Sequence, residues 1–330
     1  MKVLRHKAQI APATFFATLL NAPCSSMLLA NANSTSTVYL IIGKSNGETI
    51  FFPTDRSECV SKFECEVQVP ITALAVGDLR NVGKKEIVTI TANGLLQSLA
   101  FPNEELARVF CQQIYANVCS AQILDIDGDN LMELVVVMTD RVVRTYRSLR
   151  KLSDSFPSTN GKCLYKSMDG LLGWENLPSV MLCCPSPVKT IHPTGVWRYK
   201  RCQSVLSSNL HSVALLHSLV EKLIVVNSEC NTETQLKNIG GDIVCITTLQ
   251  LNSGLTVLVT VDTWGQLFIY GWSGNMITTT EPLARCQVLR EVDYMCGFAG
   301  AQAYSFIIGV VNIYNKISLF SIDLTHIVEV

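Results

Sequence analysis

The chain has 330 residues, of which 48% are hydrophobic and 16% are charged, so it has ample apolar surface for a large folded core and is not a disordered segment. Its 26 basic and 27 acidic residues leave a formal net charge of -1, which gives no long-range attraction to nucleic acid or to an acidic membrane. No continuous apolar run approaches the roughly 18 residues that span a bilayer.

The amino-terminal segment, residues 1–34, resembles a signal peptide, because basic residues precede a semi-apolar stretch that ends near Ala-Asn-Ala. Pro12, Asn21 and Pro23 interrupt the apolar part. The sequence leaves open whether residues 1–27 are cleaved or form part of the fold, although the repeat register described next favours a folded segment from about Leu28 onward.

Three successive segments share one pattern of polar loop, apolar strand, tight turn and second apolar strand. Their turns are at Asn46-Gly47, Asn93-Gly94 and Thr139-Asp140. Asp78 and Asp125 begin equivalent loops 47 residues apart, and a further step of 47 residues back reaches Asn31. Asn-Gly between β-rich runs is the strongest short-range signal of a hairpin.

Four more units follow at similar spacing, which makes seven. Their turns are predicted at Pro185-Ser186-Pro187, near Leu219, at Trp264-Gly265 and near Tyr314-Asn315. Units of 40 to 50 residues built from hairpins have the size of four-stranded propeller blades.

The sequence therefore predicts an all-β fold, a seven-bladed β-propeller that forms a single domain over residues 1–330. Residues 1–6 are expected to be flexible and 148–180 to be a loop insertion. A strand around Lys7 to Ala11 is predicted to complete the final blade and so remove an open sheet edge. A solenoid is the main alternative fold, but it would need capping units that the sequence does not show.

The most acidic loop of the chain begins the third unit. Its carboxylates, Asp125, Asp127, Asp129 and Glu133, occupy positions 1, 3, 5 and 9, and the carbonyl of Leu131 lies at position 7. Calcium prefers six to eight oxygen ligands, so these five with water would suffice. The equal alternative is a purely architectural loop, in which the aspartates accept backbone N–H hydrogen bonds.

The sister loops lack this ligand set. In the Asp78 loop Glu86 keeps the ninth position, but Arg80 takes the third and would oppose a cation. The Asn31 and Asn252 loops carry no comparable acids. At most one blade is therefore expected to bind calcium, and the fold does not require it.

The sequence shows no catalytic constellation, so no enzyme is predicted. The five histidines lie near no GxSxG, HExxH or phosphate-loop pattern. The thirteen cysteines, among them Cys111, Cys119, Cys245 and Cys296, lack zinc-site spacing and are interpreted as reduced, buried thiols. The four tryptophans are expected between blades or at a partner surface.

The loop DIDGDNLMEL (125–134) resembles the FG-GAP repeat of integrin alpha-chain propellers. The longer run through TDRVVRTYR is similar to the integrin-alpha FG-GAP-repeat-containing family that supplies a subunit of KICSTOR. The segments ALAVGDLRNVGKKEIVTITANGLLQSLAF, LVTVDTWGQLFIYGW and NKISLFSIDL resemble that family in the same order.

The resemblance implies a non-enzymatic scaffold. In that family a seven-bladed propeller joins kaptin and a giant scaffold subunit, and the assembly brings the GATOR GTPase-activating complex to lysosomes and restrains TOR-kinase signalling when nutrients are short. The chain departs from the family in its uncharged first loop, its compressed fifth unit and its lack of a carboxy-terminal tail. The implied location is cytoplasmic and peripheral to the lysosomal membrane, through partners.

A secreted or cell-surface, calcium-dependent adhesion propeller is the rival interpretation. The integrin-like loop, the signal-like amino terminus and the glycosylation sequon Asn33-Ser34-Thr35 favour it. The distribution of cysteines and the blade register favour the scaffold.

Overall fold

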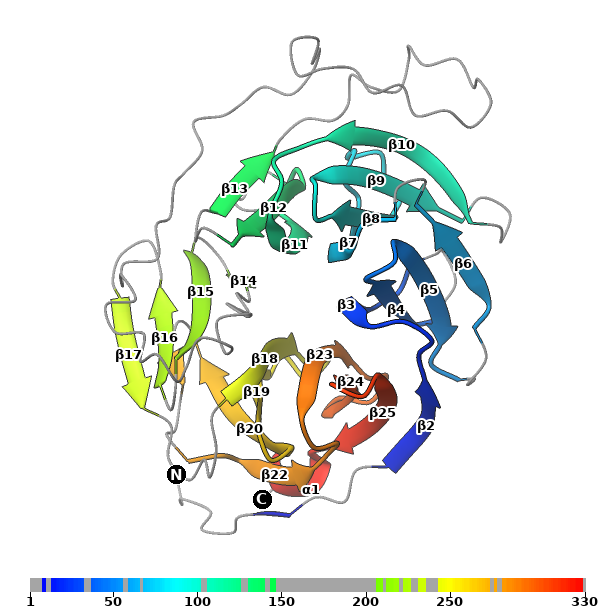
Figure 1. The fold of residues 1–330 in the computed structure, drawn as a ribbon. Helices are drawn as coiled ribbons and strands as arrows, with labels where there is room; N and C mark the ends of the chain where they lie inside the picture. The colour runs from blue at the N-terminus through cyan, green and yellow to red at the C-terminus, as the bar shows by residue number, and fades with distance from the viewer. Residues whose placement is uncertain are drawn as a thin grey trace, which may run out of the picture.

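The computed structural model describes residues 8–9, 13–32, 37–55, 59–65, 68–101, 106–125, 130–139, 143–146, 206–209, 212–219, 222–226, 231–235, 243–273, 276–277 and 281–328. These residues form six β-sheets, which follow one another in chain order around a ring (Figure 1). The all-β prediction is confirmed, since the described part of the chain has one short helix, α1 (Thr325–Val328).

The first three sheets correspond to the first three predicted units. The first contains β3 (Cys24–Ala30), β4 (Tyr39–Lys44), β5 (Glu48–Pro53) and β6 (Ser61–Glu64). The second contains β7 (Ile71–Gly77), β8 (Glu86–Thr91), β9 (Leu95–Ala100) and β10 (Ala107–Gln113), and the third contains β11 (Val118–Leu124), β12 (Glu133–Met138) and β13 (Val143–Tyr146).

The last three sheets correspond to the fifth, sixth and seventh predicted units. The fourth sheet has β14 (Leu206–Asn209), β15 (Ser212–Leu219), β16 (Lys222–Val226) and β17 (Asn231–Gln235). The fifth has β18 (Ile243–Gln250), β19 (Thr256–Asp262), β20 (Gln266–Ser273), β21 (Met276–Ile277) and β22 (Ala284–Gln287), and the sixth has β23 (Val292–Ala299), β24 (Ser305–Asn312) and β25 (Lys316–Asp323). The predicted fourth unit and the predicted insertion at 148–180 lie outside the described residues, so seven blades stay a prediction.

An amino-terminal strand completes the last sheet, as predicted, but the residues differ from the prediction. The closing strand is β2 (Ala13–Leu19), which pairs antiparallel with β25. Within the predicted Lys7 to Ala11 segment, β1 (Ala8–Gln9) pairs parallel with β22 of the fifth sheet instead. The reason lies in composition, because ATFFATL is a run of aromatic and β-branched strand formers, whereas the earlier segment is cut short by Pro12.

The 47-residue register of the sequence reappears as a repeated backbone hydrogen bond. In each of the first three sheets, the turn between the second and third strands donates an N–H to the segment that leads into the same sheet. The three bonds are Ser45 N to Pro23 O at 2.9 Å, Ala92 N to Pro70 O at 2.8 Å and Thr139 N to Asn117 O at 2.9 Å. Donors and acceptors both step by 47 residues, so the sequence repeat is a structural repeat.

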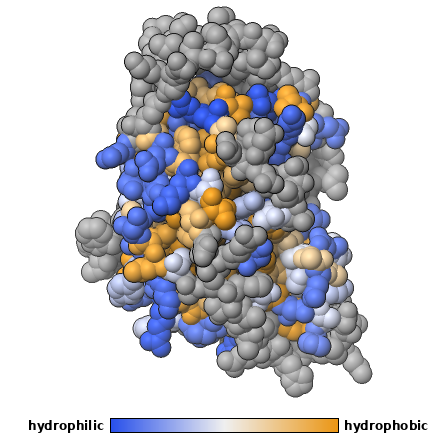
Figure 2. All heavy atoms as spheres, turned by 90° about the vertical axis from the view of Figure 1, so that its right-hand side faces the viewer, coloured by the Kyte–Doolittle hydropathy of each residue, from blue (hydrophilic) through white to orange (hydrophobic). Residues whose placement is uncertain are grey.

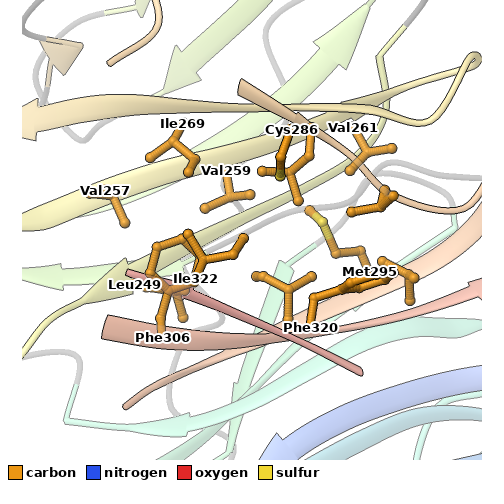
Figure 3. Close-up of a cluster of buried hydrophobic side chains, with 14 of the residues drawn as sticks. Leu249, Val257, Val259, Val261, Ile269, Cys286, Met295, Phe306, Phe320 and Ile322 are labelled. Carbon is orange, nitrogen blue, oxygen red and sulfur yellow. The ribbon is translucent and has the colours of Figure 1, made fainter. Parts of the chain in front are cut away.

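The core lies between facing sheets, which explains why the middle strands are buried along their whole length. All residues of β8 and β19 are buried, because each sheet packs on a neighbour through both faces. Between the fifth and sixth sheets, side chains from β19, β20 and β22 meet others from β23, β24 and β25 (Figure 3). Val259, Phe306 and Ile308 are each 0% exposed there, and full burial of such a side chain stabilises the fold by about 1.5–3 kcal/mol.

Glycine is required at Gly94, in the turn between β8 and β9. Its φ of 85° is a left-handed conformation, and a Cβ atom there would lie 2.5 Å from the carbonyl oxygen of Ile114. Gly254 has a similar φ of 82°, but a Cβ atom there would meet nothing within 4 Å. Comparing an alanine substitution at the two positions therefore separates the cost of a left-handed backbone from the cost of steric overlap.

We expect Gly94→Ala to lower the free energy of unfolding more than Gly254→Ala. Both variants carry the cost of about 1–2 kcal/mol for a left-handed alanine, and Gly94→Ala adds about 2 kcal/mol because the Ile114 carbonyl must shift. Urea unfolding followed by circular dichroism measures both. Equal losses in the two variants would contradict the close approach at Gly94.

Candidate functional site

The candidate site is the row of loops that connect the first and second strands of each sheet. In the second sheet this loop begins at Asp78, directly after β7, and ends at Glu86, the first residue of β8. In the third sheet it begins at Asp125, directly after β11, and ends at Glu133, the first residue of β12. The two loops are therefore equivalent residue by residue.

The Asp78 carboxylate organises its own loop. Its Oδ1 accepts the Val82 N–H at 2.9 Å, and its Oδ2 accepts the Gly83 N–H at 2.6 Å. These bonds fold the loop back onto the strand end, as aspartates do in Asx turns. The architectural role that the sequence suggests for the aspartates is thus present in this loop.

Arg80 neutralises the carboxylate at the end of the same loop. Its Nε donates to Glu86 Oε1 at 2.5 Å, and its guanidinium also forms an ion pair with that oxygen. The other oxygen, Oε2, accepts the Ser98 hydroxyl at 2.6 Å. Glu86 is 1% exposed, and a buried carboxylate needs such partners to offset its loss of hydration. The guanidinium therefore provides this loop with a cation from the chain itself.

The Asp125 loop shows the same organising hydrogen bond at its start. Asp125 Oδ2 accepts the Asn130 N–H at 2.8 Å, and Asn130 has a left-handed φ of 63°. Glu133 is 1% exposed, like Glu86. Asp127 and Asp129 lie outside the described residues, so of the five expected calcium ligands the structure places Asp125, Leu131 and Glu133.

The described part of the chain contains no group of three or more His, Cys, Asp or Glu side chains that could hold a metal ion. The donor set of this loop suits calcium only if Asp127 and Asp129 converge with Asp125 and Glu133. Calcium binding therefore stays a prediction from the loop composition.

The two loops are joined to each other through Asn81, a residue that sequence reasoning does not single out. Its side-chain Nδ2 donates to the Met132 carbonyl at 3.1 Å, and its Oδ1 accepts the Met132 N–H at 2.6 Å. Asn81 has a left-handed φ of 55°, which asparagine tolerates better than most residues. The Asn81 side-chain amide thus pairs with the Met132 backbone in the same way as a backbone amide of a neighbouring strand would. This pair of hydrogen bonds joins the second and third sheets at their loops.

An equivalent tie joins the fifth and sixth sheets. Asn252 Nδ2 donates to the Gly300 carbonyl at 2.8 Å, and the Ser253 N–H donates to the Ala303 carbonyl at 2.9 Å. The only sequence signal for both ties is an asparagine within a loop that begins a unit. Its partner is about 50 residues away, which no local pattern reveals.

The remaining predicted groups are distributed away from these loops. Trp264 lies in the turn between β19 and β20 and is 62% exposed, so it is not packed between sheets. Trp174 and Trp197 lie outside the described residues. Of the histidines, His326 lies in α1 and His217 in β15, whereas His6, His192 and His211 lie outside the described residues.

Seven described cysteines are free thiols, namely Cys24, Cys59, Cys65, Cys119, Cys245, Cys286 and Cys296. Burial raises the pKa of Cys286 to about 12, and burial together with nearby Cys24 raises the pKa of Cys296. These two thiols are therefore protonated and unreactive at neutral pH. Cys111 is disulfide-bonded, which corrects the prediction of a reduced thiol at that position.

Antiparallel sheets arranged in a ring, with a strand from the amino-terminal segment completing the last sheet, define the chain as a β-propeller. The family model described as integrin-alpha FG-GAP repeat-containing protein 2 matches residues 53–166, which include both the Asp78 and the Asp125 loops.

Two curated relatives are both named KICSTOR complex protein ITFG2. The mouse protein (Mus musculus) is 32% identical over 136 residues, which is 37% of this chain and 30% of the relative. The cattle protein (Bos taurus) is 33% identical over 137 residues, which is 37% of this chain and 25% of the relative. The match therefore spans less than a third of each relative.

Solved structures are similar at lower identity. A crystal structure of BBS1N in complex with ARL6DN, soaked with mercury, gives a TM-score of 0.49 at 10% identity and covers 91% of this chain and 80% of that chain. The lead-soaked crystal gives 0.49 at 11% identity with the same coverage. Among the described residues, no helix is long and apolar enough to cross a membrane.

We expect Asn81→Gly to weaken the contact between the second and third sheets. Glycine accepts the left-handed backbone but removes both hydrogen bonds to Met132, so the free energy of unfolding should fall by about 2 kcal/mol. Hydrogen exchange at the Met132 amide should also accelerate. Asn315→Gly is the matched control, because Asn315 has a φ of 62° and should change stability by less than about 0.5 kcal/mol. Equal effects in the two variants would contradict the tie.

We expect Asp125→Ala to lower the free energy of unfolding by about 1 kcal/mol through loss of the Asn130 hydrogen bond. If the loop is architectural, this loss is the same with and without a calcium chelator. If the loop binds calcium, chelation lowers the melting temperature of the unchanged protein, and Asp127→Ala abolishes that sensitivity. Calorimetry of the three proteins in buffer with and without chelator separates the two interpretations.

Proposed function

We propose that the protein is a non-enzymatic scaffold propeller that acts as a subunit of a KICSTOR-like complex. The observation that carries this proposal is the match of residues 53–166 to the integrin-alpha FG-GAP repeat-containing family, together with relatives that are named as KICSTOR complex proteins. The matched region holds the second sheet and the two joined loops.

The interior of the ring supports a scaffold more than a reaction centre. The innermost strands that the structure describes, β3, β7, β11, β14, β18 and β23, contain a single charged residue, Asp293. Most of the rest are small, hydroxyl-bearing or apolar residues, as in CSSMLLA of β3 and ITALAVG of β7, with three amides, Gln122, Asn209 and Gln250. The thiols of Cys24, Cys245 and Cys296 on these strands are buried, and burial raises the pKa of Cys296, so that thiol is not an activated nucleophile.

The finer proposal concerns partners and location. The protein would join kaptin and a giant scaffold subunit, and through them the GATOR GTPase-activating complex at the lysosome, where it would restrain TOR-kinase signalling during nutrient shortage. The resemblance of the DIDGDNLMELVVVMTDRVVRTYR run supports this assignment. The chain would need no membrane-spanning segment for this role, because its partners would hold it at the membrane.

Co-expression tests the proposal. The tagged chain is expected to co-purify with kaptin and the scaffold subunit and to elute with them in size-exclusion chromatography. Gly43→Val should abolish the complex, because a Cβ at Gly43 would lie 2.6 Å from the Ile71 side chain of the adjacent sheet and larger atoms would separate the two sheets. Gly254→Ala, in open space, is the control that should retain the complex.

The rival, a secreted adhesion propeller, predicts the opposite result. An expressed full-length protein would then be exported with a glycan on Asn33 and would not bind kaptin or the scaffold subunit. Mass spectrometry of the cell and medium fractions detects that outcome, which would refute the scaffold proposal.

A further inference from the structure

One face of the ring carries a run of exposed apolar side chains. Leu19, Trp264, Ile313 and Tyr314 are 71%, 62%, 56% and 65% exposed. They come from the fifth and sixth sheets, which are neighbours, and they make up half of the eight exposed large hydrophobic residues among those described. We call these four residues the apolar arc.

The topology places the four residues on the same face. In each antiparallel sheet, the turn between the second and third strands leaves on the same side as the link to the next sheet. Trp264, Ile313 and Tyr314 lie in such turns, and Leu19 ends β2, where the link into the first sheet begins. The opposite face presents Val82 from one loop and Val60 from another.

Backbone hydrogen bonds hold the arc in one rigid piece. The Val288 N–H donates to the Gly265 carbonyl at 2.9 Å, and the Ile313 N–H donates to the Glu291 carbonyl at 3.0 Å. The Leu20 N–H then donates to the Asn315 carbonyl at 3.0 Å. Each turn is thereby hydrogen-bonded to the neighbouring link between sheets. The exposed side chains therefore project from a preorganised surface, and a partner that binds there loses little free energy to ordering the loops.

The charges along the arc are unbalanced. The Tyr314 hydroxyl donates a hydrogen bond to the Glu291 carboxylate, which adds one negative charge beside the arc. Arg290 and Lys316 are exposed, and neither forms an ion pair with another described residue. The arc is therefore an apolar centre with two cations and only one carboxylate at its border.

Its composition is that of an interface centre. Tryptophan and tyrosine are enriched at the centre of protein–protein interfaces, where they contribute most of the binding energy, and charged residues are depleted there. On the side of the ring that carries β6, hydrophilic and hydrophobic residues are interspersed (Figure 2).

We propose that the apolar arc is the docking surface for another protein subunit, whose contact surface is apolar and bordered by carboxylates. The inference rests on the proposed function as a complex subunit and assigns the face of the ring that the subunit covers. A second copy of this chain fits less well, because a twofold contact would bring Arg290 and Lys316 of both copies together. An anionic lipid surface would gain only the weak attraction of two cations and would leave the rigid apolar centre without a matching surface.

The test is co-expression with kaptin and the scaffold subunit, as above. Replacing Trp264, Ile313 and Tyr314 together with serine should lower the co-purified yield at least tenfold. A Val60→Ser/Val82→Ser variant on the opposite face is the matched control and should keep the yield. Lys316→Glu should also lower the yield, whereas Lys316→Arg should keep it. Circular dichroism melts confirm that each variant folds.

A photo-crosslinking side chain at position 313 identifies what covers the arc, and the same probe at position 82 is the control. A crosslink from position 313 to an apolar segment of kaptin or the scaffold subunit that is flanked by Asp or Glu supports the proposal. A crosslink to a second copy, or sedimentation with phosphatidylserine vesicles that the serine variant loses, would overturn it. If the unchanged chain binds neither subunit, the proposed function fails. If it binds both and the serine variant binds equally well, only the docking surface fails.

Discussion

The pairing of β2 with β25 is the constraint on which the rest of the fold depends. A sheet with two apolar faces needs a neighbour on each side, and a linear row of sheets would leave its first and last faces in water. The structure avoids this by completing the sixth sheet with a strand from the amino-terminal segment, so that the sixth sheet packs on the first. The same segment also adds β1 to the fifth sheet. One stretch of chain thus covers the outer edges of two sheets, which are the edges most exposed to wrong pairing.

A buried polar cluster lies where this closing segment enters the first sheet. Lys44 Nζ donates to Asn21 Oδ1 at 2.6 Å and to Glu48 Oε2 at 2.5 Å, and Lys44 is 2% exposed. Because Asn21 lies between β2 and β3, the lysine joins the closing segment to the first hairpin. A buried ion pair of this kind contributes little net stability, but an unpaired Lys44 would be costly. The Asn21 bond therefore gives this buried lysine a second partner when the closing segment is in place.

Much of this arrangement could be predicted from local sequence, and the features that could not be predicted depend on distant partners. The hairpins follow from Asn-Gly turns and apolar runs, and the 47-residue step follows from the spacing of Asp78 and Asp125, because both signals are local. The closing strand was predicted in the right sheet but in the wrong residues, since its choice depends on β25, about 300 residues away. The ties made by Asn81 and Asn252 and the disulfide bond of Cys111 could not be predicted, because nothing near these residues in the sequence specifies the distant partner. The calcium ligands stay predictions for a different reason, since Asp127 and Asp129 lie outside the described residues.

The two faces of the ring differ in how the hydrogen-bonding groups of their loops are satisfied, and this difference supports the apolar arc as the docking face. On the face of the Asp78 and Asp125 loops, polar side chains are already committed: Asp78 to its own backbone, Arg80 to Glu86 and Asn81 to Met132. A protein that bound there would compete for these existing hydrogen bonds and would gain little apolar contact. On the other face the turns are satisfied by buried side chains at their first positions, since Asp262 Oδ1 accepts the N–H groups of Trp264 and Gln266, and Asn312 Oδ1 accepts those of Tyr314 and Lys316. Because the backbone of these turns needs nothing further, their outer side chains are free to be apolar and to contact another protein.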